Sequence, residues 1–98
     1  MVRSLSRAEY KVQGGKLIRI QLGVQADRIS QIKITGDFFM HPEELIDELE
    51  KTLIGETLDK QNLIRCIAAF MEKNGVVLLG ALPEDFAKCI LMAGGKDG

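Results

Sequence analysis

The chain has 98 residues, which is enough for one domain with a modest hydrophobic core. Its 13 basic and 14 acidic residues leave a formal net charge of −1, which argues against a protein that tracks nucleic-acid phosphates. No apolar run approaches the roughly 18 residues that span a bilayer, and the N-terminus lacks the apolar segment of a signal peptide. We therefore expect a cytoplasmic protein with no membrane and no nucleic-acid partner.

The first half of the chain predicts strands. A short strand is expected at 9–12, ended by the glycine pair 14–15. Residues 16–24 and 28–35 each alternate apolar and polar side chains, and the short polar link 25–27 joins them into a hairpin. The side chains expected to face the core are Ile18, Ile20, Leu22, Val24, Ile32 and Ile34.

The second half predicts two helices and then a third. Pro42 suits the first turn of the first helix, and Gly55 its end. Either Thr57 or Asp59 is expected to cap the second helix, which ends at 74–75. The apolar stripes of these two helices are Leu45, Ile46, Leu49, Leu53 and Ile54, and then Leu63, Ile64, Ile67, Phe70 and Met71.

Residues 76–79 are too short and too apolar to assign, and fit either a short buried strand or a packed connection. Pro83 begins the last helix, whose apolar side chains are Phe86, Ile90 and Ala93. Strands followed by helices predict an α+β fold, a small three-stranded antiparallel meander packed against about three helices. We expect a single domain over 1–98 with short flexible ends at about 1–8 and 94–98.

No catalytic or metal-binding set emerges from the residue types. Cys66 and Cys89 lie far apart without a CxxC motif, and His41 is the only histidine. Both cysteines are predicted as buried, reduced thiols within helices. The paired acids of the helical half are predicted on solvated faces.

Gly14, Gly15 and Lys16 suggest a phosphate loop, but Leu17 follows the lysine and the next element is a strand. The glycines then form a turn before the strand, and Lys16 either belongs to that turn or presents its ammonium group to an anion. Asp37 follows a glycine at a strand end, where an Asx turn would explain its carboxylate.

Phe38 and Phe39 are adjacent in a chain with four Phe, one Tyr and no Trp. Neighbouring side chains of an extended chain point to opposite faces, so one Phe is expected in the core and the other outside. The alternative is that both rings are core residues.

The stretch 9–56, EYKVQGGKLIRI…ISQIKITGDFFMHPEELIDELEKTLIGE, closely resembles the accessory, C-terminal domain of lipoate–protein ligases. The resemblance depends on the order of GGKL, an alternating hairpin, I-x-GDFF and L-x-GE, and it continues less distinctly to about residue 92. Many relatives have a proline before the glycine pair, where this chain has Gln13.

The resemblance implies a fold similar to iron–sulfur scaffold proteins of the SufE/NifU type. It also implies a two-step reaction: ATP activates lipoate as lipoyl-AMP, and the lysine of a carrier domain then attacks the adenylate. The catalytic lysine and the lipoate pocket belong to the family's large domain. The resemblance therefore implies no catalytic residue and no cofactor for this chain alone, and ATP, Mg²⁺ and lipoate for the assembled ligase.

Met1 precedes the motif by only a few residues, so we expect the small subunit of a two-chain ligase rather than an excised domain. Its implied partners are the large catalytic subunit and, through the complex, the lipoyl-carrier domains of 2-oxoacid dehydrogenases and the glycine cleavage system. The candidate binding or interface residues are Gly14, Gly15, Lys16, Gly36, Asp37, Phe38 and Phe39. A sulfur-transfer or iron–sulfur scaffold and a non-enzymatic interaction module are the alternatives.

Overall fold

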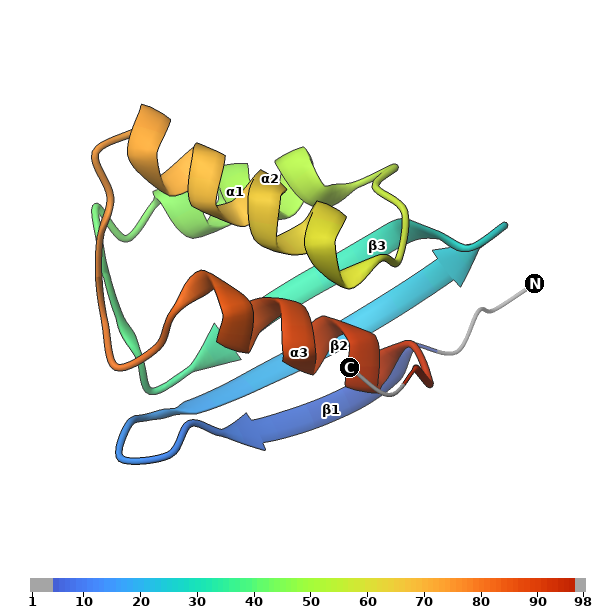
Figure 1. Ribbon diagram of the computed structural model, residues 1–98, viewed down its shortest axis with the longest axis horizontal. Helices are drawn as coiled ribbons and strands as arrows, with labels where there is room; N and C mark the ends of the chain where they lie inside the picture. Colours follow the sequence, from blue (N-terminus) through green and yellow to red (C-terminus); the bar gives the residue numbers. More distant parts are fainter. Residues whose placement is uncertain (1–4, 97–98) are drawn as a thin grey trace.

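The computed structural model describes residues 5–96, which form two small antiparallel sheets and three helices (Figure 1). The strands are β1 (Ser6–Lys11), β2 (Leu17–Gln25), β3 (Arg28–Gly36), β4 (Phe39–His41) and β5 (Val77–Leu79). The helices are α1 (Leu45–Leu53), α2 (Lys60–Lys73) and α3 (Pro83–Ala93).

The main sheet is the predicted meander, with β2 in the centre and β1 and β3 at its edges. Ile20 of β2 pairs with Ala8 of β1 on one side and with Ile34 of β3 on the other. All three helices lie on one side of this sheet in Figure 1, where α3 contacts β1 and β2 while α1 contacts β3. This arrangement confirms the α+β fold class.

The core fills the space between the sheet and the helices. Alternation along the strands and helical spacing in the second half place their apolar side chains there, as predicted. The side chains that are at most 2% exposed include Ile18, Ile20, Leu22, Ile29, Ile34, Leu49, Leu53, Leu63, Ile67, Phe86 and Ile90.

Val24 departs from the predicted alternation. The register of β2 and β3 shifts between Gly23 and Val24, so that Val24 pairs with Ile29. Gly23 pairs with Gln31 and Val24 with Ile29, so the extra residue of this bulge is Ser30 on β3. The bulge brings Ile29 to the core face, although alternation from Ile32 and Ile34 would turn it outward. Val24 lies near the end of β2, and its side chain is exposed.

The helix ends settle two open points. Asp59 rather than Thr57 caps α2, because its carboxylate accepts the Asn62 N–H at 2.9 Å. The first helix begins at Leu45, so Pro42 lies before it in a turn and not in its first helical turn. Ile54 follows the end of α1 and is exposed, which removes it from the predicted stripe.

A second, two-stranded sheet joins segments that are far apart in the sequence. β4 pairs with β5 in antiparallel register, with Phe39 opposite Leu79 and His41 opposite Val77. Residues 76–79 therefore contribute a strand, but it is not the buried strand considered from the sequence, since Val77 and Leu79 are about half exposed.

Part of each end expected to be flexible is held in the fold. Residues 6–8 belong to β1, and the Lys96 ammonium lies 2.8 Å from the Asp27 carboxylate. The rest of that expectation concerns residues 1–4 and 97–98, which lie outside the described residues. Within residues 5–96, no helix has the length and hydropathy needed to cross a bilayer.

Candidate functional site

The two segments singled out from the sequence meet at one end of the main sheet. β2 begins directly after Lys16, and β3 ends at Gly36, which pairs with Ile18. The Asp37 N–H donates to the Leu17 carbonyl oxygen at 2.9 Å, which continues the ladder one residue past the strand. This placement follows from the antiparallel hairpin, in which the start of one strand lies beside the end of its neighbour.

Gly80, which was not predicted as a site residue, joins the same place from the distant β5–α3 connection. The Lys16 N–H donates to the Gly80 carbonyl oxygen at 3.1 Å. A Cβ at Gly15 would lie 2.6 Å from that oxygen, and a Cβ at Gly80 would lie 2.5 Å from Lys16 Cγ. The close approach, together with a φ of +92° at Gly80, requires glycine there.

Gly36 permits a similarly close backbone approach at the end of β3. Its φ is +151°, and a Cβ there would overlap the Leu17 carbonyl oxygen. Gly14 lies exposed in the turn between β1 and β2. We call the set Gly15, Lys16, Gly36, Asp37 and Gly80 the glycine junction.

Two charges project from the glycine junction, and neither has a partner in the described part of the chain. The side chains of Lys16 and Asp37 are exposed, and neither takes part in an ion pair or a side-chain hydrogen bond within residues 5–96. The Asx-turn interpretation of Asp37 is therefore wrong for the described part of the chain, because no backbone N–H reaches its carboxylate. Both groups remain available to another molecule.

The adjacent phenylalanines point in opposite directions. The Phe38 ring packs edge-to-face against Phe86, with centroids 5.0 Å apart and an interplanar angle of 85°. The Phe39 side chain is 53% exposed, and its ring stacks on the His41 imidazole at 6.3 Å. One ring in and one ring out is the arrangement predicted from alternation, and the alternative of two core rings is wrong.

An apolar surface surrounds Phe39. The outward side chains of β4 and β5 are Phe39, His41, Val77 and Leu79, and we call them the ribbon face. Leu82, just beyond Gly80, is 60% exposed. Beside the ribbon face, Phe38, Phe39, Glu43 and Ile46 help to line an open hollow of about 340 Å³. Large exposed apolar groups that gather in one place are typical of binding surfaces.

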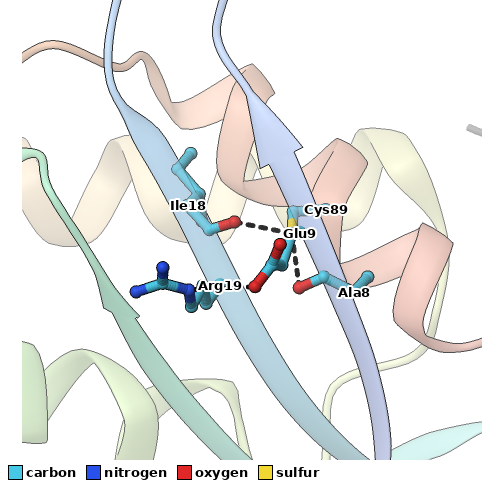
Figure 2. Close-up of polar contacts among 5 residues, drawn as sticks. All are labelled: Ala8, Glu9, Ile18, Arg19 and Cys89. Carbon is cyan, nitrogen blue, oxygen red and sulfur yellow. Dashed lines mark hydrogen bonds and ion pairs between the residues drawn. The ribbon is translucent and has the colours of Figure 1, made fainter.

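The cysteines are unsuited to sulfur chemistry. Cys89 is fully buried, and its Sγ lies 3.7 Å from the carbonyl oxygens of both Ala8 and Ile18 (Figure 2). Burial, assisted by the Glu9 charge, raises the pKa of the Cys89 thiol to about 11. Burial first, and then Glu56, also raise the pKa of the half-buried Cys66 thiol.

A reactive cysteine needs the opposite environment, exposed and with a lowered pKa. No group of His, Cys, Asp and Glu within residues 5–96 is placed to hold a metal ion. These observations give no support to the sulfur-transfer or iron–sulfur alternative.

Sequence reasoning missed Gly80 and the apolar residues around it. Gly80 ends an apolar run three residues before Pro83, which signals a turn but not what the turn touches. Val77, Leu79 and Leu82 were read as core candidates or left unassigned, because hydropathy alone does not tell a buried apolar residue from an exposed one.

Comparison with known proteins assigns these features to a family. Residues 6–90 match the family described as bacterial lipoate protein ligase C-terminus. The chain is 43% identical over 81 residues to lipoate-protein ligase A subunit 2 of Thermoplasma acidophilum, covering 83% of this chain and 82% of that protein.

The structural comparison agrees. A chain from the structural analysis of an archaeal lipoylation system, a bi-partite lipoate protein ligase and its E2 lipoyl domain from Thermoplasma acidophilum, superposes with a TM-score of 0.77. The match has 34% sequence identity and covers 91% of this chain and 97% of the other.

Proposed function

Since the chain belongs to the family of bacterial lipoate protein ligase C-terminal domains, we propose that it is the small accessory subunit of a two-chain lipoate–protein ligase. Two findings support this assignment. The relative from Thermoplasma acidophilum is named as a second subunit, and the similar structure comes from a bi-partite ligase. The proposed partner is a large catalytic subunit.

The proposed reaction has two steps, and both take place in the active site of the large subunit. The lipoate carboxylate attacks the α-phosphorus of Mg²⁺-bound ATP, forming lipoyl-AMP and releasing pyrophosphate. The amine of a carrier-domain lysine then attacks the acyl carbon, forming an amide and releasing AMP. The small subunit supplies neither nucleophile nor base, and acts by docking beside the site where the adenylate forms.

The observation that carries this role is the position of the ribbon face next to the glycine junction. Exposed aromatic and aliphatic side chains provide anchors for a stable interface. The Lys16 and Asp37 charges, which are unpaired within residues 5–96, lie at the edge of the same region. Lys16 would add positive charge there for a phosphate bound by the large subunit. Docking there excludes water from a hydrolysable adenylate, and release admits a bulky carrier domain.

The test is reconstitution. We expect this chain alone to release no pyrophosphate from ATP and lipoate, the large subunit alone to release little, and the two together to restore the reaction. Pyrophosphate release and lipoyl-AMP formation are measured for each subunit and for the mixture. Adenylation by this chain alone, or full activity of the large subunit without it, would overturn the proposal.

A further inference from the structure

The main sheet has a second face, which the helices leave open. Side chains at alternate positions of the three strands point away from the helices, in rows that the register defines. One row joins Arg7, Gln21 and Lys33, and the next joins Glu9, Arg19 and Thr35. Figure 2 shows Glu9 and Arg19 on the side of the strands away from α3.

This open face is positively charged although the whole chain is slightly acidic. On the described strands its ionisable side chains are the cations Arg7, Lys11, Arg19 and Lys33 and the one acid Glu9, in a chain with a formal net charge of −1. Glu9 is already paired, because its carboxylate lies 3.0 Å from Arg19 Nε. Arg7, Lys11 and Lys33 have no acidic partner within residues 5–96.

A simpler explanation accounts for part of this pattern. Arg7 and Lys11 lie on β1 and Lys33 on β3, which are the two edge strands. Charged residues on edge strands prevent sheets from pairing edge to edge, but either sign of charge serves that purpose. Protection of the edges therefore explains why the open face carries charged residues. It does not explain why most of these charges are positive.

From this excess of cations we propose that the open face is a docking surface for the lipoyl-carrier domain, which would contact it through acidic side chains. The proposal rests on the proposed ligase function. The ribbon face offers apolar anchors of the kind that hold a permanent subunit. The open face offers exposed long cations instead, which speed encounter and permit release. A substrate protein that must arrive and leave at each turnover fits the second kind of surface.

The test compares two triple variants in the reconstituted ligase. One variant carries Arg7→Glu, Lys11→Glu and Lys33→Glu on the open face. The matched control carries Lys60→Glu, Arg65→Glu and Lys73→Glu on exposed positions of α2, so that both lose the same net charge. Glu keeps a charge on each edge strand, which preserves protection against aggregation. A third variant with Gln at the three open-face positions replaces the first if reversal prevents folding.

The readout is kcat/KM for transfer from preformed lipoyl-AMP to the E2 lipoyl domain. At low ionic strength we expect the open-face variant to lose about tenfold while the α2 control stays close to wild type. The loss should fade at about 0.5 M salt, because salt screens exposed charges. Subunit association and pyrophosphate release are measured in parallel and should not change.

Each other outcome contradicts the docking proposal. Equal losses in both variants would mean that only net charge matters, and no loss in either would mean that the open face is merely solvated. A variant that loses retention on a DNA column but transfers normally would assign the face to a nucleic acid. Failure of the wild-type subunits to associate or to adenylate lipoate would instead overturn the proposed ligase function.

Discussion

The two sheets of this molecule differ in how far they bury their apolar side chains. The three-stranded sheet buries Ile18, Ile20 and Leu22 under the helices and turns its charged side chains to solvent. The two-stranded sheet buries Met40 but leaves Phe39 and Leu79 more than half exposed. Each of its strands has only three residues.

The difference separates residues that stabilise the fold from residues that the fold merely positions. A small domain has little apolar area to spare, so exposing several large side chains in one place is unfavourable unless something covers them. The three-stranded sheet is explained by this chain's own core. The ribbon face is not explained by that core, and docking of the proposed large subunit would cover it.

The adjacent phenylalanines give the largest expected contrast between the two regions. Phe38→Ala removes the edge-to-face contact with Phe86, and because the ring is only half-buried we expect a loss of about 3 kcal/mol in unfolding free energy. Phe39→Ala should leave stability within about 0.5 kcal/mol of wild type and weaken subunit binding by about 30-fold. Denaturant unfolding and titration calorimetry with the large subunit measure the two effects.

Each variant serves as the control for the other. Comparable losses of stability in both variants, with unchanged affinity for the large subunit, would mean that the ribbon face belongs to the fold and not to an interface. The comparison between the two sheets would then fail.

The regular part of the fold was predictable because periodicity reports burial directly. The alternating hairpin and the three helical stripes placed most of the core correctly. The inward position of Ile29 was missed because it depends on a bulge in β3, which local alternation does not reveal. The prediction for Val24 was wrong, because this residue lies near the end of β2 and is exposed. Pairing of β4 with β5 was missed because 35 residues separate them and neither strand is long enough to show a period.

Part of the candidate site was also predictable, because it follows from the geometry of the predicted hairpin. The meeting of Lys16 with Gly36 and Asp37 follows from hairpin geometry alone, and the structure places them together. Gly80 was unpredictable because its contact with Lys16 depends on how α3 packs against the sheet, a tertiary effect with no local signal.

Cys89 provides a test of the buried half of the comparison, the core between the three-stranded sheet and the helices. Its raised pKa of about 11 means that the folded state holds the neutral thiol in preference to the thiolate. The resulting stability is fully present below the ordinary thiol pKa of 9 and is lost as pH rises to about 11. Over that window the unfolding free energy should fall by up to about 1.4 kcal/mol per pH unit more in wild type than in Cys89→Ala.

Denaturant unfolding from pH 8 to pH 11 measures this difference, and the comparison with Cys89→Ala removes the titration of other groups (about 9–11 is also where Lys and Tyr begin to titrate). Parallel pH profiles for the two proteins would show that the thiol is not held neutral by the core. A rate of alkylation near that of a free thiol in the native state would contradict the same point.

The smallest expected effect concerns Lys16, and it decides what the glycine junction does beyond assembly. The ammonium group is exposed and unpaired within residues 5–96, so Lys16→Ala should leave the fold intact. If the group lies near the nucleotide in the complex, it acts most strongly while pyrophosphate departs, because negative charge is then most concentrated. An interaction made chiefly in that transition state lowers kcat without a matching rise in KM. We expect adenylation to slow about fivefold, and transfer from preformed lipoyl-AMP to change less than twofold.

Both half-reactions are measured for the mutant complex at saturating small subunit, so that weaker association does not enter the rates. The matched control is Lys60→Ala, which also removes one exposed positive charge but from α2, outside the glycine junction. Equal slowing of the two half-reactions would make Lys16 a residue of assembly. No slowing of either would leave the Gly15–Lys16 segment as a turn that begins β2, and would confine the partner's contact to the ribbon face. A selective loss in adenylation would instead extend the functional surface from the ribbon face across the glycine junction to the nucleotide.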